Sequence, residues 1–144
     1  MALFTENKEL AKKIVINAAD RLDKQMDNEG KFPKEMERTI ALHYTTFVME
    51  AFFTIANMAD KTGIDLWSMQ TPSGKSLKKG FEALRPYISK EKKWEGQQIN
   101  EYDYEEAYSL LMEAAIHLNC KNCKETIKTI AGEKTERLRI NLLY

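Results

Sequence analysis

The sequence lacks the features of a membrane or nucleic-acid-binding protein. It has only three prolines among 144 residues, and no apolar run approaches the roughly 20 residues that a membrane span needs. Basic and acidic residues balance at 22 each, so no net charge attracts nucleic acid. The N-terminus shows no basic segment followed by an apolar one, as a signal peptide would. With 43% apolar and 31% charged residues, the composition instead indicates one soluble, folded domain over residues 1–144.

Apolar residues recur at helical spacing through most of the chain. Residues 7–26 carry a four-residue repeat: Leu10, Ile14, Ala18, Leu22 and Met26. Residues 35–61 predict one longer helix, and its apolar line consists of Ile40, Tyr44, Phe47, Val48, Ala51, Phe52, Ile55 and Met58. Gly63 is a plausible stop for this helix.

Three shorter helices are expected downstream. Leu77, Phe81, Leu84 and Ile88 mark the first. Asp103 with Glu106 resembles a capping box at the start of the second, and Asn122 with Glu125 repeats that signal for the third. The tail around residues 138–142 alternates weakly and leaves strand and helix open. The predicted class is all-α, with successive antiparallel helical hairpins as in a toroid or solenoid.

One stretch concentrates the chemistry of the chain, and it runs from Gly30 to Tyr44. It contains a turn, a carboxylate, a guanidinium, an imidazole and a phenol within 15 residues. Arg38 can hold a carboxylate with two parallel hydrogen bonds, and Tyr44 can give or take a proton. By itself, Tyr44 lies on the apolar line of its helix, which favours a core aromatic.

The same stretch resembles a known family. Its pattern Gly-x-x-Pro-x-Glu-x-x-Arg-Thr-x-x-Leu-His-Tyr is similar to a segment of alginate lyases and related polysaccharide lyases with the helical toroid fold. The resemblance continues over about residues 28–100 through Phe47, Glu50-Ala51, Gly63-Ile64-Asp65-Leu66-Trp67, Thr71-Pro72-Ser73-Gly74-Lys75-Ser76-Leu77, Pro86-Tyr87, Trp94 and Gln97-Gln98-Ile99. Residues 101–144 match no motif.

The resemblance implies a function, a place and a partner. It implies β-elimination in an anionic, uronate-containing polysaccharide such as alginate, in the periplasm or outside the cell. It assigns no cofactor and no metal-ligating residue, and leaves metal dependence open. A complete toroid is longer than this chain, which would correspond to its C-terminal part. An apolar helical face would then be exposed and could allow self-association. The alternative is a non-catalytic helical module that binds polysaccharide or protein.

The resemblance also assigns roles to residues. Tyr44 would protonate the departing O4, with the role of base also open to it, and Arg38 would lie near the substrate carboxylate and the tyrosine. A nearby guanidinium favours the phenolate form of tyrosine. On a regular helix, residues six apart lie about 120° from each other, so cooperation needs Arg38 at an irregular first turn. Glu35 is a candidate to hold the guanidinium in place.

Other residues of the matched motifs are candidate substrate-binding groups with ordinary alternatives. His43 can orient a substrate or shuttle a proton, or can be paired with a carboxylate such as Glu50. Trp67 and Trp94 can stack on sugar rings or anchor loops. Gln97, like Gln98 beside it, can bind sugar hydroxyls or be ordinary loop polarity.

Two further patterns concern groups outside the matched stretch. Family members use an asparagine and a histidine from an upstream segment, and no such segment is matched here. His117 lies far downstream, so we do not assign it that role.

The spacing His117-x-x-Cys120-x-x-Cys123 offers three zinc ligands where a structural site needs four, so neither a metal nor a redox role is favoured. Lysines 75, 78, 79, 90, 92 and 93 could form a basic rim or an ordinary solvated face.

Overall fold

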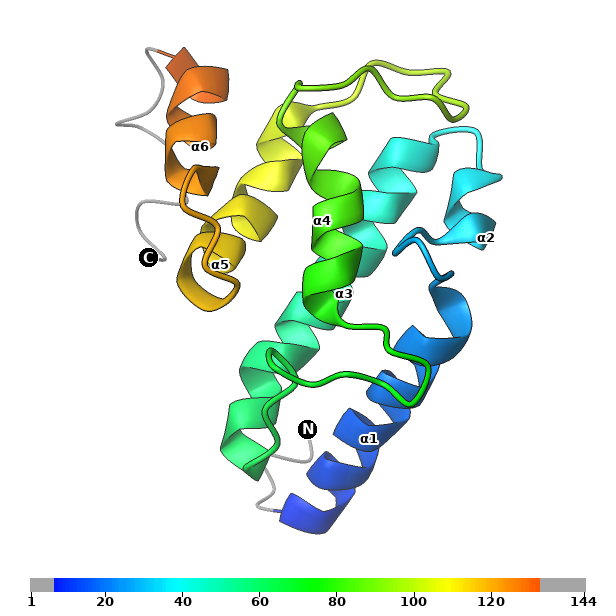
Figure 1. Ribbon diagram of the computed structural model, residues 1–144, viewed down its shortest axis with the longest axis vertical. Coiled ribbons are helices and arrows are strands. Elements are labelled where there is room, and N and C mark those ends of the chain that lie inside the picture. Colours follow the sequence, from blue (N-terminus) through cyan, green and yellow to red (C-terminus); the bar gives the residue numbers. More distant parts are fainter. Residues whose placement is uncertain (1–6, 133–144) are drawn as a thin grey trace.

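The computed structural model describes residues 7–132, and helices dominate this part of the chain (Figure 1). The elements in chain order are α1 (Lys8–Gln25), α2 (Pro33–Met36), α3 (Ala41–Ala59), η1 (Asp60–Thr62), α4 (Leu77–Ile88), η2 (Tyr104–Ala107), α5 (Tyr108–His117) and α6 (Cys123–Ala131). Within these residues the β-type pairing is a single isolated bridge between Ile40 and Gln98. The predicted all-α class is confirmed. The undecided tail, residues 138–142, lies outside the described residues.

Helix α3 is the central element of the fold. It contacts α1, α2, α4 and α5, and Figure 1 shows α1 and α3 running side by side. Its buried side packs on α4, where the Phe53 and Phe81 rings lie 6.0 Å apart, centroid to centroid. Helix α6 contacts α5 at the far end of the molecule (Figure 1). The fold therefore consists of helical hairpins arranged around α3.

The predicted continuous helix over residues 35–61 is wrong, because the chain breaks between α2 and α3. Pro33 stands at the first position of α2, where its missing N–H costs nothing. Ile40 then adopts φ −124° and pairs with Gln98. The Thr39 carbonyl accepts the Ile99 N–H at 3.0 Å, so these residues bond to a distant loop instead of continuing a helix. The break lies directly before the chemically rich end of α3.

Much of the predicted apolar line on α1 and α3 faces outward. On α1, Ala11 and Val15 are buried, whereas Ile14 is 49% exposed. On α3, Phe47 is 62% exposed and Met58 is 52% exposed. Since α3 is apolar on nearly every side, its periodicity could not tell which side faces the core.

One of these outward residues, Ile14, borders an apolar groove between α1 and α3. The groove has a volume of about 220 Å³ and is lined mainly by Ile14, Ala18, Val48, Ala51, Phe52 and Ile55. This groove is a candidate for the expected apolar helical face, which stays a prediction. No described helix has the length and apolar character that a membrane crossing would require.

Candidate active site

The entrance of α3 is fixed by the loop that follows α4. The Ala41 N–H donates to the Gln97 carbonyl at 3.0 Å, and the Leu42 N–H donates to Gln98 Oε1 at 3.1 Å. The Gln98 amide also donates to the Asn100 carbonyl at 3.0 Å. These bonds satisfy N–H groups that the first turn of a helix leaves without partners. Gln98 therefore positions the helix entrance, while the Gln97 side chain remains exposed beside it.

The break before α3 brings Arg38 and Tyr44 together. The Arg38 guanidinium carbon lies 3.8 Å from the centre of the Tyr44 ring. Stacking of this kind combines cation–π attraction with free guanidinium edges that remain able to bind a carboxylate. Arg38 is exposed and Tyr44 is half-buried, so both are accessible from solvent. The irregular turn thus allows side chains six residues apart to come into contact, which a continuous helix would prevent.

His43 is paired with a carboxylate from a distant part of the chain. Its Nδ1 lies 2.6 Å from Glu106 Oε2, and the two side chains are 39% and 36% exposed. A carboxylate partner such as Glu50, about two turns along α3, was one of the two sequence alternatives; the hydrogen bond is made by Glu106 on η2. The rings of His43 and Tyr44 are nearly perpendicular, with centroids 5.6 Å apart. The site therefore places an imidazole–carboxylate pair beside the tyrosine.

Glu50 is a second carboxylate in this neighbourhood. Its pKa is raised, mainly because burial disfavours the charged form, and the nearby Glu106 carboxylate adds to the effect. The charge of His43 opposes the shift. The imidazole thus sits in the field of two carboxylates, one that bonds to it directly and one that is partly desolvated.

Sequence reasoning missed the role of Glu106. The Asp103–Glu106 pattern predicted a capping box, in which the glutamate side chain would turn back to the helix start. Instead, Asp103 Oδ1 accepts the Glu105 N–H at 3.0 Å, and the Glu106 side chain reaches His43. Because η2 is a 3-10 turn and the pair is separated by 63 residues, no local spacing could have revealed it.

Glu35 does not hold the Arg38 guanidinium in this geometry. Its backbone carbonyl accepts the Arg38 N–H at 3.2 Å, which shapes the turn. Within residues 7–132, no salt bridge joins the two side chains. The Arg38 side chain is therefore positioned by the turn and by its contact with the Tyr44 ring, and not by Glu35.

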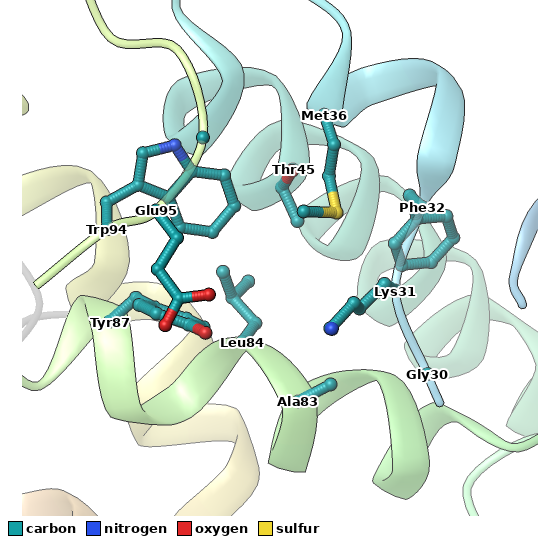
Figure 2. A pocket seen from close by; sticks show the side chains of 11 residues that line it. Gly30, Lys31, Phe32, Met36, Thr45, Ala83, Leu84, Tyr87, Trp94 and Glu95 are labelled. Carbon is teal, nitrogen blue, oxygen red and sulfur yellow. The ribbon is translucent and has the colours of Figure 1, made fainter. Parts of the chain in front are cut away.

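Trp94 lies at the edge of a narrow slot beside the α3 entrance. Figure 2 shows Trp94 and Tyr87 on one side of this slot and Lys31, Phe32 and Met36 on the other. The Trp94 and Tyr87 rings meet edge to face, with centroids 4.9 Å apart. The slot holds about 30 Å³, which is room for a water molecule and not for a sugar ring. Trp94 is half-buried, so only part of its surface is open to a substrate.

Trp67 lies in the core, away from the α3 entrance. It is 8% exposed. His117 stacks on it at 4.3 Å between centroids, and Phe53 meets it at 4.7 Å. This enclosure favours the loop-anchor alternative over the sugar-stacking one, because its flat faces are already in contact with protein.

The His117, Cys120 and Cys123 pattern also has a structural explanation. Cys120 and Cys123 form a disulfide, which ties the end of α5 to the start of α6. The His117 Nε2 lies 3.3 Å from Glu113 Oε2, and Asn57 donates to the other Glu113 oxygen at 2.8 Å. Among the described residues, no group of three potential ligands is placed to hold a metal ion.

Comparison with known proteins identifies the family. The family model described as alginate lyase matches residues 1–94. A crystal structure of an alginate lyase from Bacteroides ovatus is 30% identical and superposes with a TM-score of 0.77. That match covers 96% of this chain but 35% of the lyase, so the chain spans about a third of its length.

The structural match covers 96% of this chain and therefore extends past residue 100, where the sequence motifs stop. No curated protein shows significant sequence similarity to the chain. The described part of the chain is all-helical, as part of a helical toroid would be, and the family resemblance of the sequence is confirmed. Because the family model covers well over half of its residues, this chain belongs to the alginate lyase family.

Proposed function

We propose that this chain carries the proton-transfer part of a polysaccharide lyase that cleaves uronate-containing polymers such as alginate by β-elimination. The observation that supports this most directly is the Arg38 guanidinium stacked 3.8 Å from the Tyr44 ring centre, in a chain of this family. The pair lies at a solvent-accessible helix entrance. A phenol and a guanidinium there supply a proton donor and a carboxylate-binding group at one point.

The reaction sets three tasks for such a site. The substrate carboxylate must be neutralised, the proton on C5 must be removed, and the departing O4 must be protonated. Arg38 binds the carboxylate through its free edges, and Tyr44 donates its phenolic proton to O4. Trp94 and Gln97 lie on the loop bonded to the start of α3, and we assign them to the substrate path with His43. Trp67 is left out because it is enclosed.

The test compares the chain with its Tyr44→Phe variant on polymannuronate, polyguluronate and glucuronan. Formation of the unsaturated uronate product is followed by its ultraviolet absorbance. Loss of a positioned proton-transfer group should lower the rate about 100-fold or more. Tyr104→Phe is the matched control, because it removes a phenolic hydroxyl from η2 while leaving the α3 entrance intact. Equal rates in Tyr44→Phe and the unsubstituted protein would remove Tyr44 from the mechanism.

The second candidate is a non-catalytic helical module that associates with another copy of itself. The exposed apolar groove between α1 and α3 favours it, since such a face is unusual on a monomer surface. Sedimentation should then show a dimer that dissociates when Ile14→Glu places a charge in the groove. Ile16→Glu on the same helix lies outside the groove and is the control. A monomer at all concentrations would contradict this candidate.

We also propose a periplasmic or extracellular location. The Cys120–Cys123 disulfide supports it, because disulfides persist in oxidising compartments and are rare in the cytosol. A polymeric anionic substrate would also be met outside the cytoplasm. Fractionation of cells that produce the full gene product tests the location, and recovery in the cytosolic fraction would contradict it.

A further inference from the structure

We infer that Glu106 fixes the tautomer of His43 so that Nε2 accepts a proton, which makes His43 the base that complements Tyr44. This inference rests on the proposed lyase function for its catalytic half. Its positioning half concerns this chain alone. The sequence pattern gave Glu106 only a helix-capping role, and the matched motifs do not include it.

The first step of the argument is the hydrogen bond between the two side chains. Glu106 Oε2 lies 2.6 Å from His43 Nδ1, a distance typical of a charge-assisted bond. A carboxylate is an acceptor only, so a neutral imidazole bonded to it must carry its proton on Nδ1. Nε2 is then the nitrogen with the free lone pair.

The second step concerns what surrounds the other ring nitrogen. Among the described residues, His43 Nε2 has no hydrogen-bond partner. The His43 side chain is 39% exposed, so the ring is open to solvent on part of its surface. A base must lie within hydrogen-bond reach of the proton it takes, and an unpartnered nitrogen on a partly exposed imidazole can meet that requirement.

The third step is the position of His43 relative to Tyr44. The two rings are adjacent on α3, nearly perpendicular, with centroids 5.6 Å apart. Arg38 stacks on the Tyr44 ring, and Glu106 bonds to His43. The Tyr44 ring is thus in contact with a carboxylate-binding cation, and the His43 ring is bonded to a carboxylate. This division of charge suits an acid and a base that act in one reaction.

The proton balance of the step follows from these positions. The C5–H bond breaks and its proton moves to His43 Nε2, while the bonding electrons form the C4–C5 double bond. The C4–O4 bond breaks, and O4 keeps the electron pair of that bond and takes the phenolic proton of Tyr44. The imidazolium of His43 then returns a proton to the Tyr44 phenolate, directly or through one water molecule. No oxidant, reductant or further reactant is required.

The positioning half is tested by nitrogen-15 chemical shifts of the imidazole rings, which report the protonated nitrogen. The chain has only two histidines, so His43→Gln assigns the signals at once. At about pH 8, where an ordinary histidine is neutral, we expect the His43 proton on Nδ1. Glu106→Ala should move it toward Nε2, and Glu106→Gln, which keeps a neutral acceptor, should have an intermediate effect. Glu105→Gln on the same turn is the control and should change nothing.

The catalytic half is tested by kinetics on the same variants. His43→Gln should lower kcat about 100-fold or more with KM nearly unchanged. Glu106→Ala should give a smaller loss in the same direction, and Glu105→Gln should have no effect. Melting curves of each variant show that the fold is retained.

The two readouts separate the possible failures. A tautomer that does not respond to Glu106→Ala would overturn the positioning role, whatever the activity. A tautomer set by Glu106 with full activity in His43→Gln would overturn the catalytic role while Tyr44→Phe still tests the lyase. Absence of product from the unsubstituted protein would refute the proposed function together with the catalytic half, and the chemical shifts would still decide the positioning half.

Discussion

Replacement of Gly30 by alanine should damage the turn that leads from α1 into the candidate site. Gly30 has φ +87°, a left-handed conformation that only glycine adopts freely. A Cβ at this position would lie 2.5 Å from the Lys79 carbonyl oxygen. That oxygen belongs to the backbone of α4, so it cannot retreat as the end of a flexible side chain would. The alanine variant therefore suffers both a backbone and a packing penalty.

The size of the effect follows from these two penalties. A non-glycine residue in the left-handed region costs about 1–2 kcal/mol. Overpacking against a fixed group adds about 1–3 kcal/mol. The free energy of unfolding should therefore fall by about 2–5 kcal/mol, which in a chain of this size lowers Tm by about 5–15 °C.

Gly74→Ala supplies the matched control. Gly74 has φ +78°, nearly that of Gly30, but a Cβ there would meet no atom within 4 Å. Thermal and denaturant unfolding of both variants should show a loss of about 1–2 kcal/mol for Gly74→Ala and a clearly larger loss for Gly30→Ala. Equal losses in the two variants would refute the close approach of this turn to α4.

Two other substitutions test the polar contacts. Burial and the Glu106 charge raise the pKa of Glu50. Ionised Glu50 therefore destabilises the fold at a pH above that raised pKa, and this destabilisation disappears as the pH falls below the ordinary pKa of glutamate. Glu50→Gln should therefore raise Tm at about pH 8 and should no longer raise it at about pH 4. The exposed Glu37→Gln is the control and should leave Tm unchanged at both pH values. A lower Tm of Glu50→Gln at about pH 8 would contradict the raised pKa of Glu50. Asn57→Ala should lower the free energy of unfolding by about 1.5–3 kcal/mol in urea titrations, because it removes a donor from the buried Glu113 carboxylate. An unchanged urea midpoint would show that this bond does not link α3 to α5.

Local sequence signals predicted what depends on neighbouring residues. The helix over residues 7–26, the stop at Gly63 and the helix from Leu77 to Ile88 were all visible in the sequence, and each is present. The break between α2 and α3 was not visible, because it depends on pairing of Ile40 with Gln98, far along the chain. Long-range backbone pairing leaves no periodic trace in a short segment.

The sequence by itself determined the helical class, the family and the stretch in which the chemistry is concentrated. These follow from spacing and from residue types, which are local properties. Only the tertiary structure decided that Arg38 stacks on Tyr44, that Glu106 rather than Glu50 bonds to His43, and that Trp67 is enclosed. It also decided which apolar side of α3 faces the core. Each of these depends on how distant segments pack, and an apolar or charged residue type is compatible with several such packings.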